Sequence, residues 1–147
     1  MCGIAGIINK AGNPEENLLS NLTVMSRLIE HRGPDGDGIW CRHNKSVGLA
    51  HRRLSIIDIS EKASQPMVRE KNYAITYNGE IYNYKELRKE LQTSGNLFST
   101  NSDTEVILQL FDKYKFDAFK KLSGIFAISI WDTLTKTLYL VRDTLGV

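Results

Sequence analysis

Short apolar segments separated by polar turns predict a chain rich in β-strands. Residues 2–8 are apolar and contain β-branched side chains, which predicts a buried strand at the start of the chain. Residues 39–41 and 47–49 flank a polar turn at His43-Asn44-Lys45 and predict two more strands, the second of which continues in extended form from His51 to Asp58.

The second half of the chain carries the clearest strand signal. Residues 73–77 are rich in strand-forming side chains, and Leu97-Phe98 predicts a short strand. Apolar residues alternate between positions 126 and 131, and a turn at 133–136 leads into the apolar segment 138–142. We expect these last two segments to form a long hairpin in the core of a sheet.

Helical periodicity occupies the segments between these strands. The first helix should begin at Asn13-Pro14, with Asn13 as the N-cap, and end near His31. Further helices are expected from Asn83 to Ser94, from Ser102 onwards and over residues 118–122. Strands and helices therefore occur together along the whole chain.

Polar residues mark the connections between these elements. Ser102 and Glu105 have the spacing of a capping box, and residues 33–38 and 60–66 are expected to be loops. Asn78-Gly79 is a frequent hairpin-turn sequence. Because a helix and not a strand follows it, we place Asn78-Gly79 at a strand-to-helix junction, where an amide side chain and a backbone N–H can face a site.

The composition excludes several classes of protein. The 147 residues fit one domain, and a net charge of +2 with interspersed acidic and basic residues predicts neither a nucleic-acid partner nor an anionic membrane partner. Two cysteines, Cys2 and Cys41, make neither a disulfide framework nor a metal cluster. No segment has the length of a membrane span or the basic start of a signal peptide, so the expected compartment is the cytoplasm.

Cys2 is the first candidate for chemistry. Removal of Met1 would place a thiol and a free α-amine on one residue. The amine titrates near about 7.7–8.0 and the thiol near about 8.5, so the amine can accept the thiol proton at neutral pH. The alternative is a small buried cysteine that only packs, which is also what we expect of Cys41.

Two charged residues allow two interpretations each. Arg53 can be a solvated charge at a sheet edge or a bidentate partner for a carboxylate, and the two-residue strand period places it opposite in facing to Arg52. Asp103 can stabilise the start of a helix through its dipole or accept a ligand ammonium group. The residues alone leave both alternatives open.

Five ordered segments of this chain resemble those of one enzyme family. They are Cys2-Gly3-Ile4-Ala5-Gly6, His31-Arg32-Gly33-Pro34-Asp35-Gly36, Ala50-His51-Arg52-Arg53-Leu54-Ser55-Ile56-Ile57-Asp58, Asn78-Gly79-Glu80-Ile81-Tyr82-Asn83 and Ser102-Asp103-Thr104-Glu105-Val106-Ile107. Together they are similar to the glutaminase domain of glutamine-hydrolysing asparagine synthetases, which are class II amidotransferases with an N-terminal nucleophile. The resemblance covers essentially the whole chain.

The resemblance implies an α+β fold, a four-layer αββα sandwich of two antiparallel sheets, and one amidotransferase domain over residues 1–147. It implies that Cys2 is the nucleophile and that Asn78 and Gly79 form the oxyanion hole. It also implies that glutamine is bound by a set of residues on several segments. These are Arg53 for the α-carboxylate, Asp103 and Glu80 for the α-amino group, and the backbone of Leu54, Ser55, Ile56 and Ile57 along the pocket.

The resemblance also sets expectations for cofactors and partners. No cofactor or metal is expected in this domain, whereas ATP and Mg²⁺ would act in a synthetase domain that accepts the ammonia. The chain stops at Val147 directly after a strand, so we expect the C-terminal part of the sheets and the synthetase domain to be missing, and no synthetase activity from this chain. A homodimer is compatible with the family.

Three alternatives stay open for the function. The chain can be an amidotransferase of the same branch with another acceptor, a non-catalytic fragment that only binds glutamine, or an N-terminal nucleophile hydrolase acting on another amide. Arg53 and Asp103 speak against the last alternative, because they suit a free amino acid.

Overall fold

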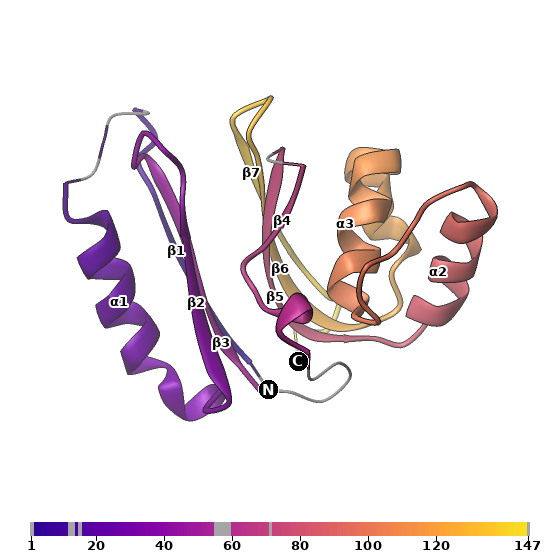
Figure 1. The fold of residues 1–147 in the computed structure, drawn as a ribbon, viewed down its shortest axis with the longest axis horizontal. Helices are drawn as coiled ribbons and strands as arrows, with labels where there is room; N and C mark the ends of the chain where they lie inside the picture. Colours follow the sequence, from indigo (N-terminus) through magenta and orange to yellow (C-terminus); the bar gives the residue numbers. More distant parts are fainter. Residues whose placement is uncertain (1, 12–13, 15, 55–59, 71, 147) are drawn as a thin grey trace.

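Two antiparallel sheets lie face to face between helices in the computed structural model, which describes residues 2–11, 14, 16–54, 60–70 and 72–146 (Figure 1). One sheet has three strands in the order β1-β3-β2, and the other has four in the order β4-β5-β6-β7. α1 covers the outer face of the three-stranded sheet, and α2 and α3 lie outside the four-stranded sheet. The expected four-layer αββα architecture is therefore confirmed.

The elements follow one another with short connections. Their bounds are β1 Gly3–Ile8, α1 Leu18–Leu28, η1 Glu30–Arg32, β2 Gly36–Cys41, β3 Val47–Arg53, η2 Glu61–Ala63, β4 Met67–Arg69, β5 Tyr73–Ile81, α2 Tyr84–Thr93, α3 Asp103–Tyr114, η3 Lys115–Lys121, β6 Gly124–Asp132 and β7 Thr137–Arg142, where η marks 3-10 helix.

The register of the three-stranded sheet decides which side chains reach the centre of the molecule. Gly3 pairs with Arg52 and Ile4 pairs with His51, so alternate residues of β3 point to opposite faces. Ala50 packs with α1, whereas Leu49 packs with Ala74 and Trp131 of the four-stranded sheet. By this alternation, His51 and Arg53 face the other sheet, as Leu49 does.

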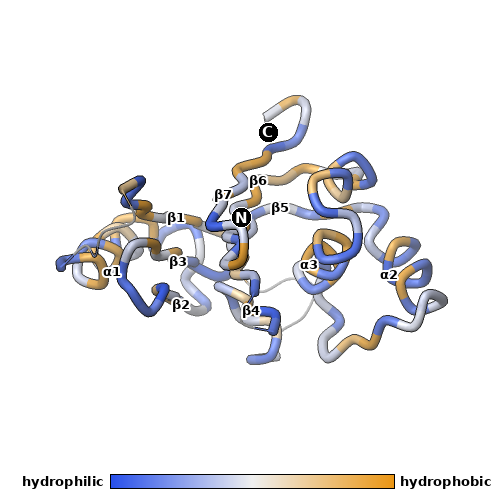
Figure 2. Tube along the Cα trace, turned by 90° about the horizontal axis from the view of Figure 1, so that it is seen from above, coloured by the Kyte–Doolittle hydropathy of each residue, from blue (hydrophilic) through white to orange (hydrophobic). Residues whose placement is uncertain are grey.

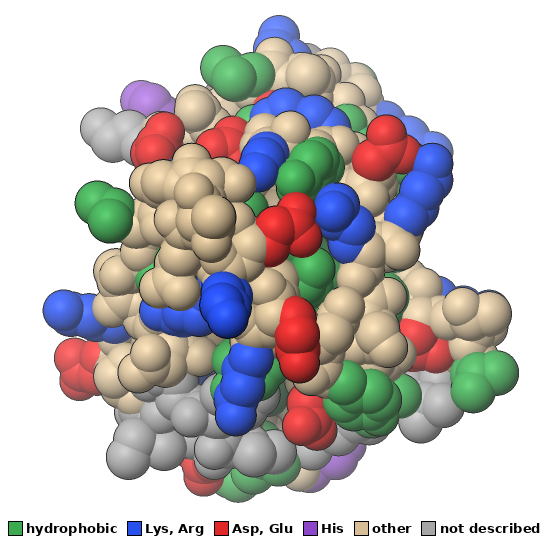
Figure 3. Space-filling model, turned by 90° about the vertical axis from the view of Figure 1, so that its right-hand side faces the viewer, with side chains coloured by type: hydrophobic (Ala, Val, Ile, Leu, Met, Phe, Trp, Pro, Cys, Tyr) green, Lys and Arg blue, Asp and Glu red, His purple; other side chains and the backbone are tan. Residues whose placement is uncertain are grey.

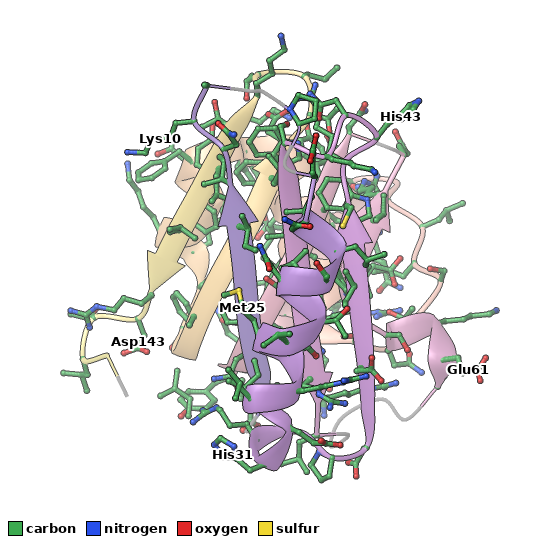
Figure 4. All side chains as sticks on the ribbon, turned by 90° about the vertical axis from the view of Figure 1, so that its left-hand side faces the viewer. Lys10, Met25, His31, His43, Glu61 and Asp143 are labelled. Carbon is green, nitrogen blue, oxygen red and sulfur yellow. The ribbon has the colours of Figure 1, made fainter. Side chains whose placement is uncertain are left out.

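Figure 4 views this layer from the side of α1. His31, directly after the helix, and His43, in the turn between β2 and β3, lie at opposite ends of the sheet. Across the described parts of the chain, no three His, Cys, Asp or Glu side chains gather closely enough to hold a metal ion.

The larger hydrophobic core lies between the four-stranded sheet and its two helices. Tyr73, Ile75 and Tyr77 of β5 pack there against α3, whose Phe111 is fully buried. In Figure 2, hydrophobic stretches lie along β6 and on parts of α2 and α3. This core fixes β5, the strand that carries Asn78 and Gly79, against the start of α3.

The surface agrees with the nearly balanced charge. Figure 3 shows the face formed by the helical side of the four-stranded sheet, where basic and acidic side chains are interspersed. Among the described residues, no helix is both long enough and apolar enough to cross a bilayer.

Several predicted boundaries were wrong. α1 begins at Leu18 with Asn17 at its N-cap, although the start was predicted at Asn13-Pro14. The chain at Leu97-Phe98 forms no strand, and residues 67–69, which we predicted no element for, pair with β5 as β4. Such short edge strands depend on a partner strand and have almost no signal of their own.

The predicted junction at Asn78-Gly79 was also wrong. β5 continues through both residues to Ile81, with Asn78 paired to Ala127 and Gly79 to Phe126. Nine consecutive residue pairs between β5 and β6 outweigh the local preference of Asn-Gly for a turn. The two residues are therefore held by the sheet and not by a flexible turn, which suits a site that needs fixed geometry.

The capping box at α3 forms only in half. Ser102 caps the helix by accepting a hydrogen bond from the Thr104 N–H. The Glu105 carboxylate instead accepts hydrogen bonds from the N–H groups of Ser99 and Thr100. The carboxylate thus fastens the preceding loop to the helix.

His51 is the most deeply buried titratable side chain between the two sheets. It is 1% exposed, and its Nε2 donates to the carbonyl of Tyr77 at 3.2 Å. Burial lowers the pKa of His51 to about 4, although the hydrogen bond to Tyr77 acts in the opposite direction. The imidazole is therefore neutral at neutral pH and joins β3 to β5.

We expect His51 to make the fold sensitive to mild acid. The His51 imidazole binds a proton near pH 6.5 in the unfolded chain and only near pH 4 in the folded protein. The stabilisation that the neutral imidazole gives above pH 6.5 is therefore lost as the pH falls. Between pH 8 and 5 this loss should reach about 2 kcal/mol. Urea unfolding of the parent and of His51→Gln at several pH values measures this loss. If the free energy of unfolding changed equally with pH in both proteins, His51 would not be the group responsible.

Candidate functional site

The Cys2 thiol lies against the backbone at the end of β3. Its Sγ is 3.3 Å from the amide nitrogen of Leu54, which donates to it, and 3.6 Å from the Leu54 carbonyl oxygen. The residue is half-buried just before β1, so the thiol is both supported and partly accessible. The backbone of Leu54 therefore lies beside the Cys2 thiol.

The loop after α1 holds this arrangement in place. Arg32 donates from Nε to the carbonyl oxygen of Cys2 at 3.1 Å, and the Asp35 N–H donates to the carbonyl of Arg53 at 3.0 Å. A Cβ on Gly33 would lie 2.4 Å from the carbonyl carbon and oxygen of Arg52, so only glycine permits this approach. The Arg-Gly-Pro-Asp segment thus clamps both Cys2 and the end of β3.

Arg32 is a residue of this candidate site that no local sequence pattern indicates. The only signal was its place inside a motif that we interpreted as a tight connection. An exposed arginine near a helix end has no local feature that distinguishes it from an ordinary surface charge. Its contact with Cys2 joins positions 30 residues apart and needs the folded chain.

The two neighbouring arginines have different environments, as the strand period predicted. Arg52 is buried toward α1, where it donates to the Ser26 carbonyl and forms ion pairs with Glu30 at 3.2 Å and Asp37 at 3.6 Å. Arg53 points the other way and donates to the Ser60 carbonyl at 3.0 Å. Arg52 is thus occupied by the fold, whereas Arg53 extends toward the loop that follows β3.

Asn78 and Gly79 lie on β5 opposite this corner. The Asn78 Oδ1 atom is buried and accepts no hydrogen bond from the described residues. Gly79 has φ = +151°, and a Cβ there would lie 2.1 Å from the carbonyl oxygen of Ile125. Glu80 follows as an exposed residue. The unpartnered oxygen is an acceptor and cannot stabilise a developing negative charge, which would need the Nδ2 donor of the same amide together with a backbone N–H.

Asp103 reaches β5 from the start of α3. Its side chain is buried, and its Oδ2 accepts hydrogen bonds from the Tyr77 hydroxyl at 2.7 Å and from the Ile81 N–H at 3.3 Å. Burial raises the pKa of Asp103, while the hydrogen bond from Tyr77 lowers it. The side chain is therefore more than a helix-dipole residue, because it is fixed to the strand that carries Asn78.

The structure thus brings most of the candidate residues to one region. β1 and β3 both contact β5, so Cys2, Leu54 and Arg53 approach β5 from one side and Asp103 approaches it from the other. Ser55, Ile56 and Ile57 lie outside the described residues. Cys41 packs instead with the cluster beneath α1, and burial raises the pKa of its thiol.

Comparisons with known proteins agree on one family. The family model described as "Glutamine amidotransferase domain" matches residues 1–147. Asparagine synthetase [glutamine-hydrolyzing] 1 of Bacillus subtilis is 46% identical over the whole chain, and a putative asparagine synthetase of Methanocaldococcus jannaschii is 39% identical. The chain spans 23% and 31% of the length of these two relatives.

Solved structures share the fold at lower identity. The glutamine phosphoribosylpyrophosphate amidotransferase of B. subtilis, solved with ADP and GMP, superimposes with a TM-score of 0.79 at 20% identity. The match covers 99% of this chain and 38% of that chain. At this identity the comparison supports the two-sheet architecture alone.

We expect Gly79→Ala to destabilise the protein far more than Gly95→Ala. Both glycines have positive φ, at +151° and +90°, but nothing lies within 4 Å of a Cβ at Gly95. Gly95→Ala should therefore cost only backbone strain, about 1–2 kcal/mol. Gly79→Ala adds an overlap with β6 and should cost at least about 3 kcal/mol. Chemical denaturation of both variants tests this, and equal losses would contradict it.

Proposed function

Because this chain belongs to the glutamine amidotransferase domain family, we propose that it hydrolyses the side-chain amide of L-glutamine with Cys2 as the nucleophile. The observation that supports the proposal is the Cys2 thiol held against Leu54 at the end of β3, a strand that contacts β5, on which Asn78 and Gly79 lie. Removal of Met1 is part of the proposal, because it frees the α-amine that accepts the thiol proton.

The reaction proceeds through a thioester. The Cys2 thiolate attacks the side-chain amide carbon, and the oxygen of the tetrahedral intermediate accepts hydrogen bonds from the Asn78 side-chain amide and the Gly79 N–H. Loss of one such donor typically costs about 10²–10³ in rate. The protonated α-amine of Cys2 gives its proton to the leaving nitrogen, so ammonia departs. Water then hydrolyses the γ-glutamyl thioester to glutamate and restores the thiol.

Charged groups would select the amino acid end of the substrate. Arg53 would bind the α-carboxylate of glutamine, and Asp103 with Glu80 would bind the α-ammonium group. The backbone of residues 54–57 would line the pocket. Arg32 would keep Cys2 oriented through its carbonyl, which the structure places 3.1 Å from the guanidinium Nε.

The acceptor of the ammonia is proposed from the relatives. Relatives up to 46% identical are named as asparagine synthetases, and this chain spans only part of their length. We propose that the ammonia serves ATP- and Mg²⁺-dependent amidation of aspartate by a synthetase domain that the 147 residues do not contain. The two unpaired cysteines fit a reducing compartment, which supports the cytoplasm as its location.

We expect a glutamine-like electrophile to label Cys2 and no other residue. Incubation of the 147-residue protein with 6-diazo-5-oxo-L-norleucine should give a single adduct on a chain without Met1, detected by intact mass and located by peptide mapping. Cys2→Ala should take up no adduct although Cys41 is still present. A processed, folded chain that takes up no adduct would contradict the proposal and would leave a non-catalytic glutamine-binding fragment as the better description.

We expect Arg53→Ala and Arg52→Ala to have separate effects. Loss of a carboxylate partner at Arg53 should raise KM for glutamine by about ten-fold or more with kcat little changed. Arg52→Ala should lower the stability instead, because it removes the contacts of β3 with Ser26 of α1 and with Glu30 after it. Steady-state glutaminase assays with thermal unfolding measure both, and an unchanged KM in Arg53→Ala would disprove the assignment.

A further inference from the structure

Tyr77 is held at all three of its polar groups by three different parts of the fold. Its N–H donates to Gln65 Oε1 at 2.6 Å, its carbonyl accepts from His51 Nε2 at 3.2 Å, and its hydroxyl donates to Asp103 Oδ2 at 2.7 Å. The three partners lie before β4, on β3 and at the start of α3. The sequence around Tyr77 indicates no role in glutamine hydrolysis, because its ring continues the apolar face of β5.

The same network extends to the first turn of α3. Gln65 uses its second polar group to donate from Nε2 to Thr104 Oγ1 at 3.2 Å. Thr104 directly follows Asp103, so one side chain ties the backbone of Tyr77 to the helix that carries the carboxylate. Tyr77 and Asp103 are therefore fixed relative to each other through both the phenol and Gln65.

The hydrogen bond between Tyr77 and Asp103 is buried on both sides. Tyr77 is 3% exposed and Asp103 is 4% exposed. Burial and the nearby carboxylate raise the pKa of Tyr77, so the phenol keeps its proton and is the donor. Burial raises the pKa of Asp103, and the phenol is the strongest of the groups that lower it. The phenol thus favours the ionised carboxylate in a place where ionisation is otherwise costly.

We propose that Tyr77 is a positioning residue for substrate specificity: its hydroxyl holds the Asp103 carboxylate in the geometry that recognises the α-ammonium group of glutamine. The inference rests on the proposed function and extends it, because it assigns amino-acid recognition to a residue that does not touch the substrate. Phenylalanine would fill the same space in the core around Phe111 and lack only the donor. The hydroxyl is therefore the group that the proposal assigns to recognition.

Two substrates that differ only in the ammonium group separate this role from a structural one. L-Glutamine and glutaramate share the amide and the α-side carboxylate, but glutaramate has hydrogen in place of the α-amino group. In the parent protein, kcat/KM should be far higher for glutamine. In Tyr77→Phe we expect kcat/KM for glutamine to fall about ten-fold through KM, with kcat little changed and glutaramate hydrolysis unaffected.

Two further variants calibrate the measurement. Asp103→Asn should remove most of the discrimination between the two substrates. This loss is the largest that Tyr77→Phe could cause through Asp103. Tyr73→Phe is the matched control, because Tyr73 lies on the same face of β5, is equally buried, and has its hydroxyl bonded to Lys115 and not to Asp103. Tyr73→Phe should lose stability and keep the parent discrimination between glutamine and glutaramate.

Each outcome has one meaning. A Tyr77→Phe protein with the parent discrimination overturns the inference, and so does an equal loss on both substrates, because the phenol would then act on the fold or on the reacting amide. If the parent protein hydrolyses neither substrate and takes up no electrophilic glutamine analogue, the proposed function fails, and the inference fails with it. If the parent protein is active and Tyr77→Phe keeps the same discrimination between glutamine and glutaramate, the inference fails but the proposed function stands.

Discussion

The two stacked sheets must be held at a fixed distance and register, and different contacts do this at the two ends of the space between them. At one end, Leu49, Ala74 and Trp131 form an ordinary apolar contact. Toward the other end, His51 reaches across from β3 to a carbonyl of β5, and Gln65 binds the N–H of the same residue. The polar contacts fix the distance and register between the sheets, whereas apolar packing alone tolerates small slips.

The candidate site depends on this fixed register. Cys2 directly precedes β1, the strand that pairs with β3, and Asn78 belongs to the strand that His51 and Gln65 hold. Cys2 and Asn78, the proposed nucleophile and oxyanion donor, keep their separation only if the two sheets cannot slide. The clamp made by Arg32 and Gly33 adds a third restraint, because it binds Cys2 and the end of β3 from the side of α1.

Local patterns predicted most strands and helices but few of the contacts that matter. The alternation in residues 126–131 predicted β6 correctly, and the helical spacing of Ile107, Leu110 and Phe111 predicted α3, although this helix buries every residue from Asp103 to Phe111. The extension of β5 through Asn78-Gly79 was missed, since turn propensity is local and the nine pairings with β6 are not. The short β4 was missed for the same reason.

Through its ordered motifs and their resemblance to amidotransferases, the sequence alone predicted the layers of the fold and a candidate nucleophile next to the start of the chain. Strand parity predicted that Arg52 and Arg53 face opposite ways, but only the motif that carries the resemblance assigned the carboxylate of glutamine to Arg53. Arg32 and Tyr77 had no distinguishing feature. Tertiary structure decided these, because the contacts of Arg32 with Cys2 and of Tyr77 with Asp103 span 30 and 26 residues. A pattern with a period of two or 3.6 residues reports which face a side chain takes, but not which distant atom it meets there.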